Sequence, residues 1–241
     1  MRLVLVLMKQ FEKYSKYHVN FYTGEVRPLL DKYIKSVPWQ SFLDVGCGDG
    51  ALLYAMKTNG YMKDKDVHAV DLSKERIQRA KRVDDKFKCF VDDAESLKTV
   101  SSESIDLLVS VNVAEHVDDV KMIKAIHRVL KNGGVAYLST TFKKWYGWYF
   151  YRSKGKWVLD PTHLREYTDD NQLLGLLVKN GFTVLETTKS VSSYPIIEIF
   201  SRVLRLSGQA SKNPLFRLAR KVRVPIVGYY KWEIVCQKKA G

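Results

Sequence analysis

Four short segments carry residues whose types and spacing could hold a nucleotide-like cofactor. In the first, residues 43–50, an apolar strand enters a turn with an acid and three alternating glycines, and a helix-like run follows. Glycine lets the backbone turn tightly and lets a ligand approach closely, and the helix start beyond it offers unpaired N–H groups. The candidate cofactor-binding residues in this turn are Asp44, Gly46, Cys47, Gly48 and Gly50.

The second and third segments each end an apolar strand with acids. Asp71 follows the strand predicted at 66–70, about 20 residues after the glycines, where an acid in a βαβ unit accepts ribose hydroxyls. A strand-end acid can also begin a helix, and Ser73 could cap that helix itself. The third segment, residues 90–95, contains two neighbouring acids, of which the second, Asp93, precedes Ala94.

The fourth segment, residues 105–117, is a buried strand that continues through Asn112 and Val113 to the pair Glu115–His116. We expect a helix to begin before this pair. Since all four segments follow strands of one predicted parallel sheet, their side chains should gather at its carboxyl edge, where open α/β sheets bind ligands.

Read loosely, the glycine turn fits the fingerprint of dinucleotide-binding folds. In detail it resembles the first motif of class I S-adenosylmethionine (SAM)-dependent methyltransferases, in which an acid precedes three alternating glycines. The run Glu115-His116-Val117 resembles the type 11 subgroup of that family. The resemblance implies an α/β fold with a doubly wound, mostly parallel seven-stranded sheet, and SAM as the cofactor.

The resemblance also implies a role for each segment. The glycine turn with Asp44 would hold the methionine end of SAM, Asp71 would bind the ribose, and Leu72 would lie beside the adenine. Asp93–Ala94 would read the amino edge of the adenine, with the preceding acid as the alternative register. Residues Asn112–His116, including Val113, would flank the cofactor and the site of methyl transfer.

The pair Glu115–His116 could also contribute metal ligands. The quinone-biosynthesis O-methyltransferases have a similar stretch, with an additional acid where this chain has Asn112. Because that acid is absent, we expect no bound metal, and we interpret the pair as a helix-start acid beside a histidine packed on the cofactor.

The composition favours one folded domain over residues 1–241 in a reducing, cytoplasmic compartment. No apolar run approaches about 20 residues, and the three cysteines lack zinc-type spacing. The net charge is +14, and residues 201–241 carry ten Lys or Arg residues against the single acid Glu233. Such a basic balance fits nucleic acid, an anionic membrane surface or an acidic substrate.

The remaining pattern predicts alternating strands and helices. Strands are expected at 41–45, 66–70, 87–91, 105–110, 135–140, 182–188 and 232–236. Helices are expected from Pro28, from 51 to Gly60, from Ser73 to 83, over 117–130, and over 169–179 with Thr168 as the cap. Three further segments are an N-terminal helical cover at 1–36, an aromatic and basic loop at 142–168, and an amphipathic helical insert at 191–230.

Acceptor choice should depend on these three segments. Residues 142–157 interleave eight aromatic with five basic residues. This run fits a stacking surface for single-stranded nucleic acid, a lid over an apolar acceptor, an interfacial belt or a packed covering loop. In the insert, residues 195–206 and 213–222 predict two cationic amphipathic helices, which fit either interfacial membrane helices or a helical cap.

The segment Asp160–Thr168 resembles the type 11 run that lies near the acceptor pocket. His163 in this run is the candidate general base, since an unperturbed imidazole titrates near neutral pH. His116 is the second candidate catalytic residue. Many methyltransferases need no strong base, because the sulfonium is a good leaving group and in-line positioning dominates.

We therefore expect methyl transfer from SAM to oxygen on a small or lipid-linked acceptor, with peripheral contact to an anionic membrane. Two alternatives stay open: an RNA methyltransferase that uses the basic segments, and a non-catalytic SAM-binding protein. Nucleic acid is the less favoured partner. The Asn/Asp-Pro-Pro-Tyr signature of enzymes that methylate nucleic-acid amino groups is absent, since Asn112-Val113-Ala114-Glu115 stands at that position.

Overall fold

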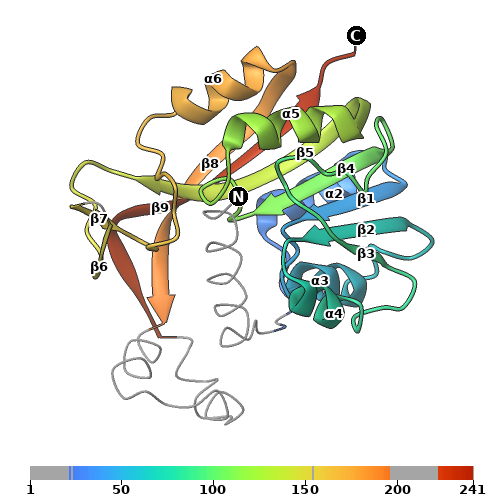
Figure 1. Cartoon of the computed structure of the whole chain (residues 1–241), viewed down its shortest axis with the longest axis horizontal. Coiled ribbons are helices and arrows are strands. Elements are labelled where there is room, and N and C mark those ends of the chain that lie inside the picture. Colours follow the sequence, from blue (N-terminus) through green and yellow to red (C-terminus); the bar gives the residue numbers. More distant parts are fainter. Residues whose placement is uncertain (1–21, 23, 154, 196–221, 241) are drawn as a thin grey trace, which may run out of the picture.

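A single seven-stranded sheet organises the chain (Figure 1). The computed structural model describes residues 22, 24–153, 155–195 and 222–240. The strand order is β3-β2-β1-β4-β5-β9-β8, in which the first five strands are mutually parallel and β9 runs antiparallel to both of its neighbours. This is the doubly wound, mostly parallel sheet that the sequence predicts.

The strands of the sheet are β1 (Ser41–Val45), β2 (Asp66–Asp71), β3 (Lys88–Val91), β4 (Ile105–Val111), β5 (Leu130–Lys143), β8 (Phe182–Pro195) and β9 (Arg223–Lys238). A separate two-stranded hairpin consists of β6 (Tyr151–Ser153) and β7 (Lys156–Val158). The described helices are α2 (Pro28–Ser36), α3 (Ala51–Thr58), α4 (Lys74–Ala80), α5 (Asp119–Val129) and α6 (Asn171–Lys179).

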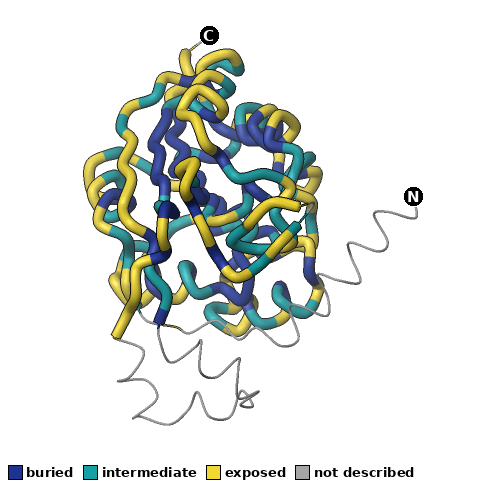
Figure 2. The backbone as a smooth tube through the Cα atoms, turned by 90° about the vertical axis from the view of Figure 1, so that its left-hand side faces the viewer, coloured by how far each residue is buried: buried dark blue, intermediate teal, exposed yellow. Residues whose placement is uncertain are grey.

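Helices cover both faces of the sheet (Figure 1). Successive strand residues point to opposite faces, so Leu43 and Leu108 pack under α5 and α6, whereas Phe42 and Leu107 pack under α2, α3 and α4. Burial on both faces explains why β1 and β4 read as continuous apolar runs rather than as alternating ones. Figure 2 shows the buried residues gathered along the strands.

Several helix boundaries confirm the local signals. Pro28 opens α2 at its first position, and the Ser73 hydroxyl caps α4 by accepting from the Arg76 N–H at 3.4 Å. Thr168 does not cap α6, because the helix begins at Asn171 and the Thr168 N–H instead donates to the Gln172 side chain at 2.8 Å.

The prediction of a helical insert at 191–230 is wrong at the two ends that the structure describes, because both ends are strands. Residues 191–195 belong to β8 and residues 223–230 belong to β9, where the two strands pair up to Pro195 and Arg223. The run after residue 222 is rich in β-branched residues, which favour a strand that pairs with a neighbour. The predicted amphipathic helices at 196–221 and the helical cover before residue 22 lie outside the described residues.

The predicted loop at 142–168 is also more ordered than expected, because it contains the β6–β7 hairpin and its first residues extend β5. Among the described residues, no helix is both long and apolar enough to cross a membrane.

Candidate active site

The glycine turn lies at the carboxyl ends of β1 and β2. The N–H groups of Gly46 and Cys47 both donate to the Val70 carbonyl, at 2.8 and 2.9 Å, and the three glycines all have positive φ. Glycine is required at Gly46, because a Cβ there would lie 2.3 Å from a methyl of Val113. The turn therefore packs directly against the segment that follows β4.

Asp71 at the end of β2 is bonded to this turn. One carboxylate oxygen accepts from the Gly48 N–H at 2.9 Å and the other from the Ser73 N–H at 2.8 Å. A carboxylate offers about four acceptor positions, so Asp71 keeps capacity for ribose hydroxyls. Leu72 beside it is 39% exposed, which leaves an apolar surface for an adenine ring.

Asp44 is the most unusual charge in the turn. Its side chain is buried, and one carboxylate oxygen has no hydrogen-bond partner among the described residues. Burial and the nearby Asp71 raise the pKa of Asp44 to about 8. A buried acid of this kind is stabilised either by a proton or by a cationic ligand, and the ammonium of an amino-acid ligand would serve. Burial also raises the pKa of the Cys47 thiol, so Cys47 lines the turn as a neutral group.

A further ion pair, which the sequence analysis missed, holds the turn to α4. Asp49 is buried within the turn and pairs with Arg79 at 3.1 Å. The Tyr22 hydroxyl donates to the Asp49 carbonyl at 2.6 Å, so a residue of the N-terminal cover reaches the same turn.

The two acids after β3 differ in how many hydrogen bonds their carboxylates accept. Asp92 accepts from the Asp93 N–H and from both the N–H and hydroxyl of Thr99, at 2.7 to 2.8 Å. Asp93 accepts from the Glu95 N–H at 2.9 Å and is exposed. Asp93, followed by Ala94, is thus the acid with more capacity for a ligand, which supports the predicted register.

After β4 the chain makes a turn instead of the predicted helix start. Asn112 has a φ of +55°, and its N–H donates to the Ser139 carbonyl at 2.7 Å. Asn tolerates this left-handed conformation better than most residues. The helix α5 begins only at Asp119, with the Asp118 carboxylate as its cap. The residues from Asn112 to His116 therefore form a loop beside the glycine turn.

Glu115 joins this loop to the segment around His163. Its carboxylate is buried and accepts from the hydroxyls of Thr140 and Thr141, at 2.8 and 3.4 Å. Its main-chain carbonyl accepts from the Leu164 N–H at 2.8 Å. The two loops that carry the predicted catalytic histidines are consequently fixed to each other and to β5.

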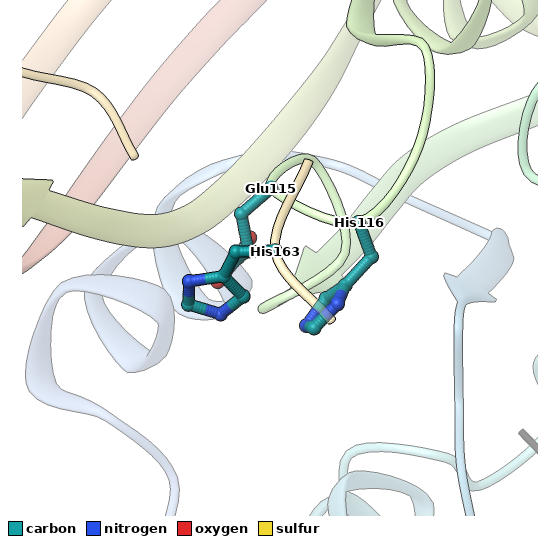
Figure 3. A group of neighbouring side chains, drawn as sticks. All are labelled: Glu115, His116 and His163. Carbon is teal, nitrogen blue, oxygen red and sulfur yellow. The ribbon is translucent and has the colours of Figure 1, made fainter. Parts of the chain in front are cut away.

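The structure brings the two candidate catalytic residues together. The rings of His116 and His163 meet edge to face with centroids 4.8 Å apart, and Figure 3 shows them side by side on their two loops. The His116 Nδ1 lies 3.2 Å from the Thr162 hydroxyl, which itself donates to Asp160 at 2.7 Å. Because the Thr162 hydroxyl donates its hydrogen to Asp160, it can only accept from His116. We therefore assign the proton of the neutral His116 ring to Nδ1.

His163 is oriented by Glu166, a residue that the sequence analysis did not single out. The His163 Nδ1 lies 3.3 Å from the Glu166 carboxylate, which also accepts from the Leu159 N–H and the Tyr229 hydroxyl, at 2.6 and 3.0 Å. Burial raises the pKa of Glu166, but these hydrogen bonds and Lys143 outweigh it and hold that pKa below the ordinary value. An ionised Glu166 can only accept, so the Nδ1 of His163 donates to it.

The same group of side chains offers possible metal ligands. Donor atoms of Glu115, His116 and His163 lie within 4.8 Å of one another, and imidazole with carboxylate is a common donor set for zinc. Both oxygens of Glu115 already accept a threonine hydroxyl, which favours a structural role for this acid. The absence of a metal stays a prediction.

Burial lowers the pKa of His116 below the usual 6.5, and the neighbouring His163 lowers it further, although Glu115 and Asp160 act in the opposite direction. At neutral pH His116 is therefore an uncharged imidazole that can accept a proton. The site thus combines a cofactor turn, two acids at successive strand ends and a pair of histidines.

Comparisons with known proteins agree with this geometry. A family model described as a methyltransferase domain, of type 11, matches residues 43–138. No curated protein matches the chain. A SAM-dependent methyltransferase from Methanosarcina mazei has the same fold, with a TM-score of 0.61 at 17% identity over 90% of this chain and 100% of the other.

Two further solved structures show how varied the chemistry on this fold is. The [4+2]-cyclase SpnF matches with a TM-score of 0.61 at 19% identity, over 93% of this chain and 87% of the other. A Haemonchus contortus phosphoethanolamine N-methyltransferase, solved with S-adenosylhomocysteine, matches with a TM-score of 0.58 at 19% identity, over 88% of this chain and 51% of the other. The fold alone therefore does not name the reaction. The matched residues 43–138 contain all of the predicted cofactor motifs, and this part of the chain is a methyltransferase domain of type 11 with SAM as its cofactor.

Proposed function

We propose that this methyltransferase transfers the methyl group to a hydroxyl oxygen of a small or lipid-linked acceptor. The observation that carries the proposal is the His116–His163 pair, whose ring centroids lie 4.8 Å apart on loops fixed beside the glycine turn. Methylation of a hydroxyl requires that the oxygen lose its proton, and a neutral imidazole within reach is a suited acceptor.

Bound SAM supplies an electrophilic methyl group on a sulfonium that leaves readily. Asp44 and the glycine turn would hold its amino-acid end, Asp71 its ribose, and Asp93 with Ala94 its adenine. The unpartnered buried oxygen of Asp44 and the close approach that Gly46 allows both fit such a ligand.

His163 is the residue to which we assign the proton. Glu166 accepts the Nδ1 hydrogen of His163, which places the lone pair of the neutral ring on Nε2. The same carboxylate stabilises the imidazolium that forms when Nε2 takes the hydroxyl proton, as an orienting acid does in a nucleophile–histidine–acid arrangement. His116 packs on the His163 ring and limits the positions that this ring can take.

The test of this proposal is transfer of a labelled methyl group from SAM into separated pools of lipid, small molecules, protein and RNA. We expect label in a lipid or small-molecule pool, in a linkage that nuclear magnetic resonance identifies as an O-methyl ether. Label on nitrogen or carbon would overturn the hydroxyl assignment, and label in RNA would favour the RNA methyltransferase alternative.

A further inference from the structure

We propose that an aromatic and basic face on the far end of β9 docks on an anionic bilayer surface. We define this docking face as Lys144, Trp145, Trp148, Phe150, Arg152, Lys156, Trp157, Val222, Val224 and Val227. Binding of the face to a bilayer is independent of the proposed function. Its consequence, that the acceptor is a lipid-linked hydroxyl compound presented at the bilayer surface, rests on that function.

Exposed aromatic side chains form the centre of the docking face. Trp145 is 92% exposed and Phe150 is 59% exposed, which is unusual for rings of this size. Trp148 contacts Phe150 and Trp157, with ring centroids 4.9 and 5.7 Å apart. Trp148, Phe150 and Trp157 thus form a contiguous exposed aromatic cluster. Tryptophan is well suited to the boundary between lipid and water.

The charge of the face is of one sign. The docking face contains the three exposed cations Lys144, Arg152 and Lys156 and no Asp or Glu. The Arg152 guanidinium stacks over the Trp157 ring at 4.6 Å, which interleaves the cations with the aromatic rings. This arrangement complements a surface that is both anionic and apolar, which an anionic bilayer provides.

Aliphatic side chains distinguish a bilayer from a nucleic acid as the occupant. Val222, just before β9, is 59% exposed, and on β9 Val227 is 58% exposed and Val224 is also exposed. Valine offers a base no stacking partner, whereas it gains free energy when it enters the acyl boundary of a bilayer. The mixture of tryptophan, valine and cations is therefore typical of interfacial binding.

The docking face is held rigidly on β9. The N–H groups of Lys144 and Trp148 donate to the carbonyls of Gly228 and Val227, at 2.8 and 3.1 Å. A Cβ on Gly228 would lie 2.5 Å from the Cα of Gly147, so two glycines permit this close contact. In Figure 1 the β6–β7 hairpin lies beside the end of the β8–β9 ribbon, away from the helix-covered part of the sheet.

Hydrogen bonds connect the docking face to the histidine pair. The Trp157 carbonyl accepts from the Lys143 ammonium and, at 3.5 Å, from the Tyr229 hydroxyl. Lys143 and Tyr229 also contact the Glu166 carboxylate, at 3.3 and 3.0 Å, and Glu166 orients His163. A head group held at the docking face would thus lie close to the proposed base.

Vesicle co-sedimentation of the full chain tests the docking itself. The vesicles are pure phosphatidylcholine or phosphatidylcholine with phosphatidylglycerol, each at low and high salt. We expect binding to the anionic vesicles that weakens with salt, and little binding to the neutral ones. No binding to anionic vesicles, or tighter binding to single-stranded RNA at matched salt, would overturn the proposal.

Two variants locate the binding on this face. Since a cation near an anionic bilayer strengthens binding by roughly fivefold, K144Q/R152Q/K156Q should weaken vesicle binding by about 100-fold. Trp145→Ser with Phe150→Ser should weaken it at low and high salt alike. The matched control is K63Q/K98Q/K124Q, which removes three exposed lysines elsewhere on the protein. It should bind vesicles at least tenfold more tightly than the first variant. Equal losses in both triple variants would overturn the assignment to this face.

Separate outcomes distinguish docking from the proposed function. SAM binding, measured by calorimetry, should be unchanged in all variants, which shows that they fold. If the Trp145→Ser, Phe150→Ser variant loses methyl transfer to a membrane lipid pool but keeps SAM binding, docking delivers the acceptor. If vesicles bind normally and label appears in a water-soluble acceptor, the lipid-linked acceptor is refuted while the docking stands.

Discussion

The imidazole rings of His116 and His163 lie edge to face at 4.8 Å, although one residue follows β4 and the other follows the β6–β7 hairpin. The contact depends on Glu115, whose carbonyl accepts from Leu164 and whose carboxylate is bonded to two threonines of β5. Two loops that are distant in sequence thereby bring two imidazole rings together near the glycine turn.

Turnover should depend on pH through this pair. Burial and His163 lower the pKa of His116, so His116 stays neutral at pH 6.5 and gains its proton only at lower pH. A cationic His116 beside His163 opposes proton transfer to the second ring. We predict that protonation of His116 lowers kcat/KM on the acid side, below pH 6.5, and that His116→Gln removes this contribution to the pH profile. An unchanged acid limb in His116→Gln would contradict the role of His116.

Binding of SAM should release a proton at pH 7. The pKa of Asp44 is about 8 without a ligand, so most molecules carry a proton on this carboxyl group. The ammonium of the bound amino-acid end favours the charged carboxylate and lowers that pKa, which releases close to one proton per SAM. Calorimetry in two buffers of different ionisation enthalpy measures the release. Asp44→Asn should abolish it, and a binding heat independent of the buffer in the unaltered protein would refute the role of Asp44.

Asp71→Ala should weaken SAM binding severely, because the ribose loses a charged acceptor and the Gly48 and Ser73 N–H groups lose theirs. The effect on the dissociation constant should be at least about 10-fold. Asp93→Ala should also weaken binding, and Asp92→Ala, which removes hydrogen bonds from Asp93 and Thr99, serves as its control. Unchanged affinity in Asp71→Ala would remove this residue from the site.

The reaction should not need a metal ion. Glu115 already accepts two threonine hydroxyls, and the position of a further acid is taken by Asn112. We predict that prolonged treatment with a chelator leaves kcat within about twofold of the untreated enzyme. A large loss that returns on addition of zinc or magnesium would show that Glu115, His116 and His163 hold a metal.

The cofactor side of this molecule could be predicted from the sequence because its signals are local. Gly46 and Asp71 belong to short strand–turn–helix units, and the right-handed connections of such units leave few possible arrangements of their strands in a parallel sheet. The acceptor side could be predicted only in part. His163 was identified through its ring chemistry, but Glu166 and Tyr229 reach it through long-range packing that no local pattern encodes.

The incorrectly predicted insert also shows that a local sequence pattern does not reveal long-range strand pairing. Apolar residues at 195–206 and 213–222 fit helical arcs when read locally, and the predicted insert extends over 191–230, yet β8 and β9 pair along its described ends. Pairing between residues such as Tyr194 and Val224 satisfies the backbone of both strands and overrides the helical periodicity. Tyr229 lies between the predicted helix at 213–222 and the predicted strand at 232–236, so no local pattern placed it near the histidines.

The most direct test of the central claim is methyl transfer by His163→Gln under saturating SAM. We predict that kcat falls by roughly 100-fold or more, because the proposed proton acceptor is gone, while the dissociation constant of SAM stays within about twofold. His68→Gln, which alters an imidazole ion-paired with Asp66 on β2, should keep the original kcat. A His163→Gln enzyme with normal turnover would contradict the account and leave His163 as a structural residue of its loop.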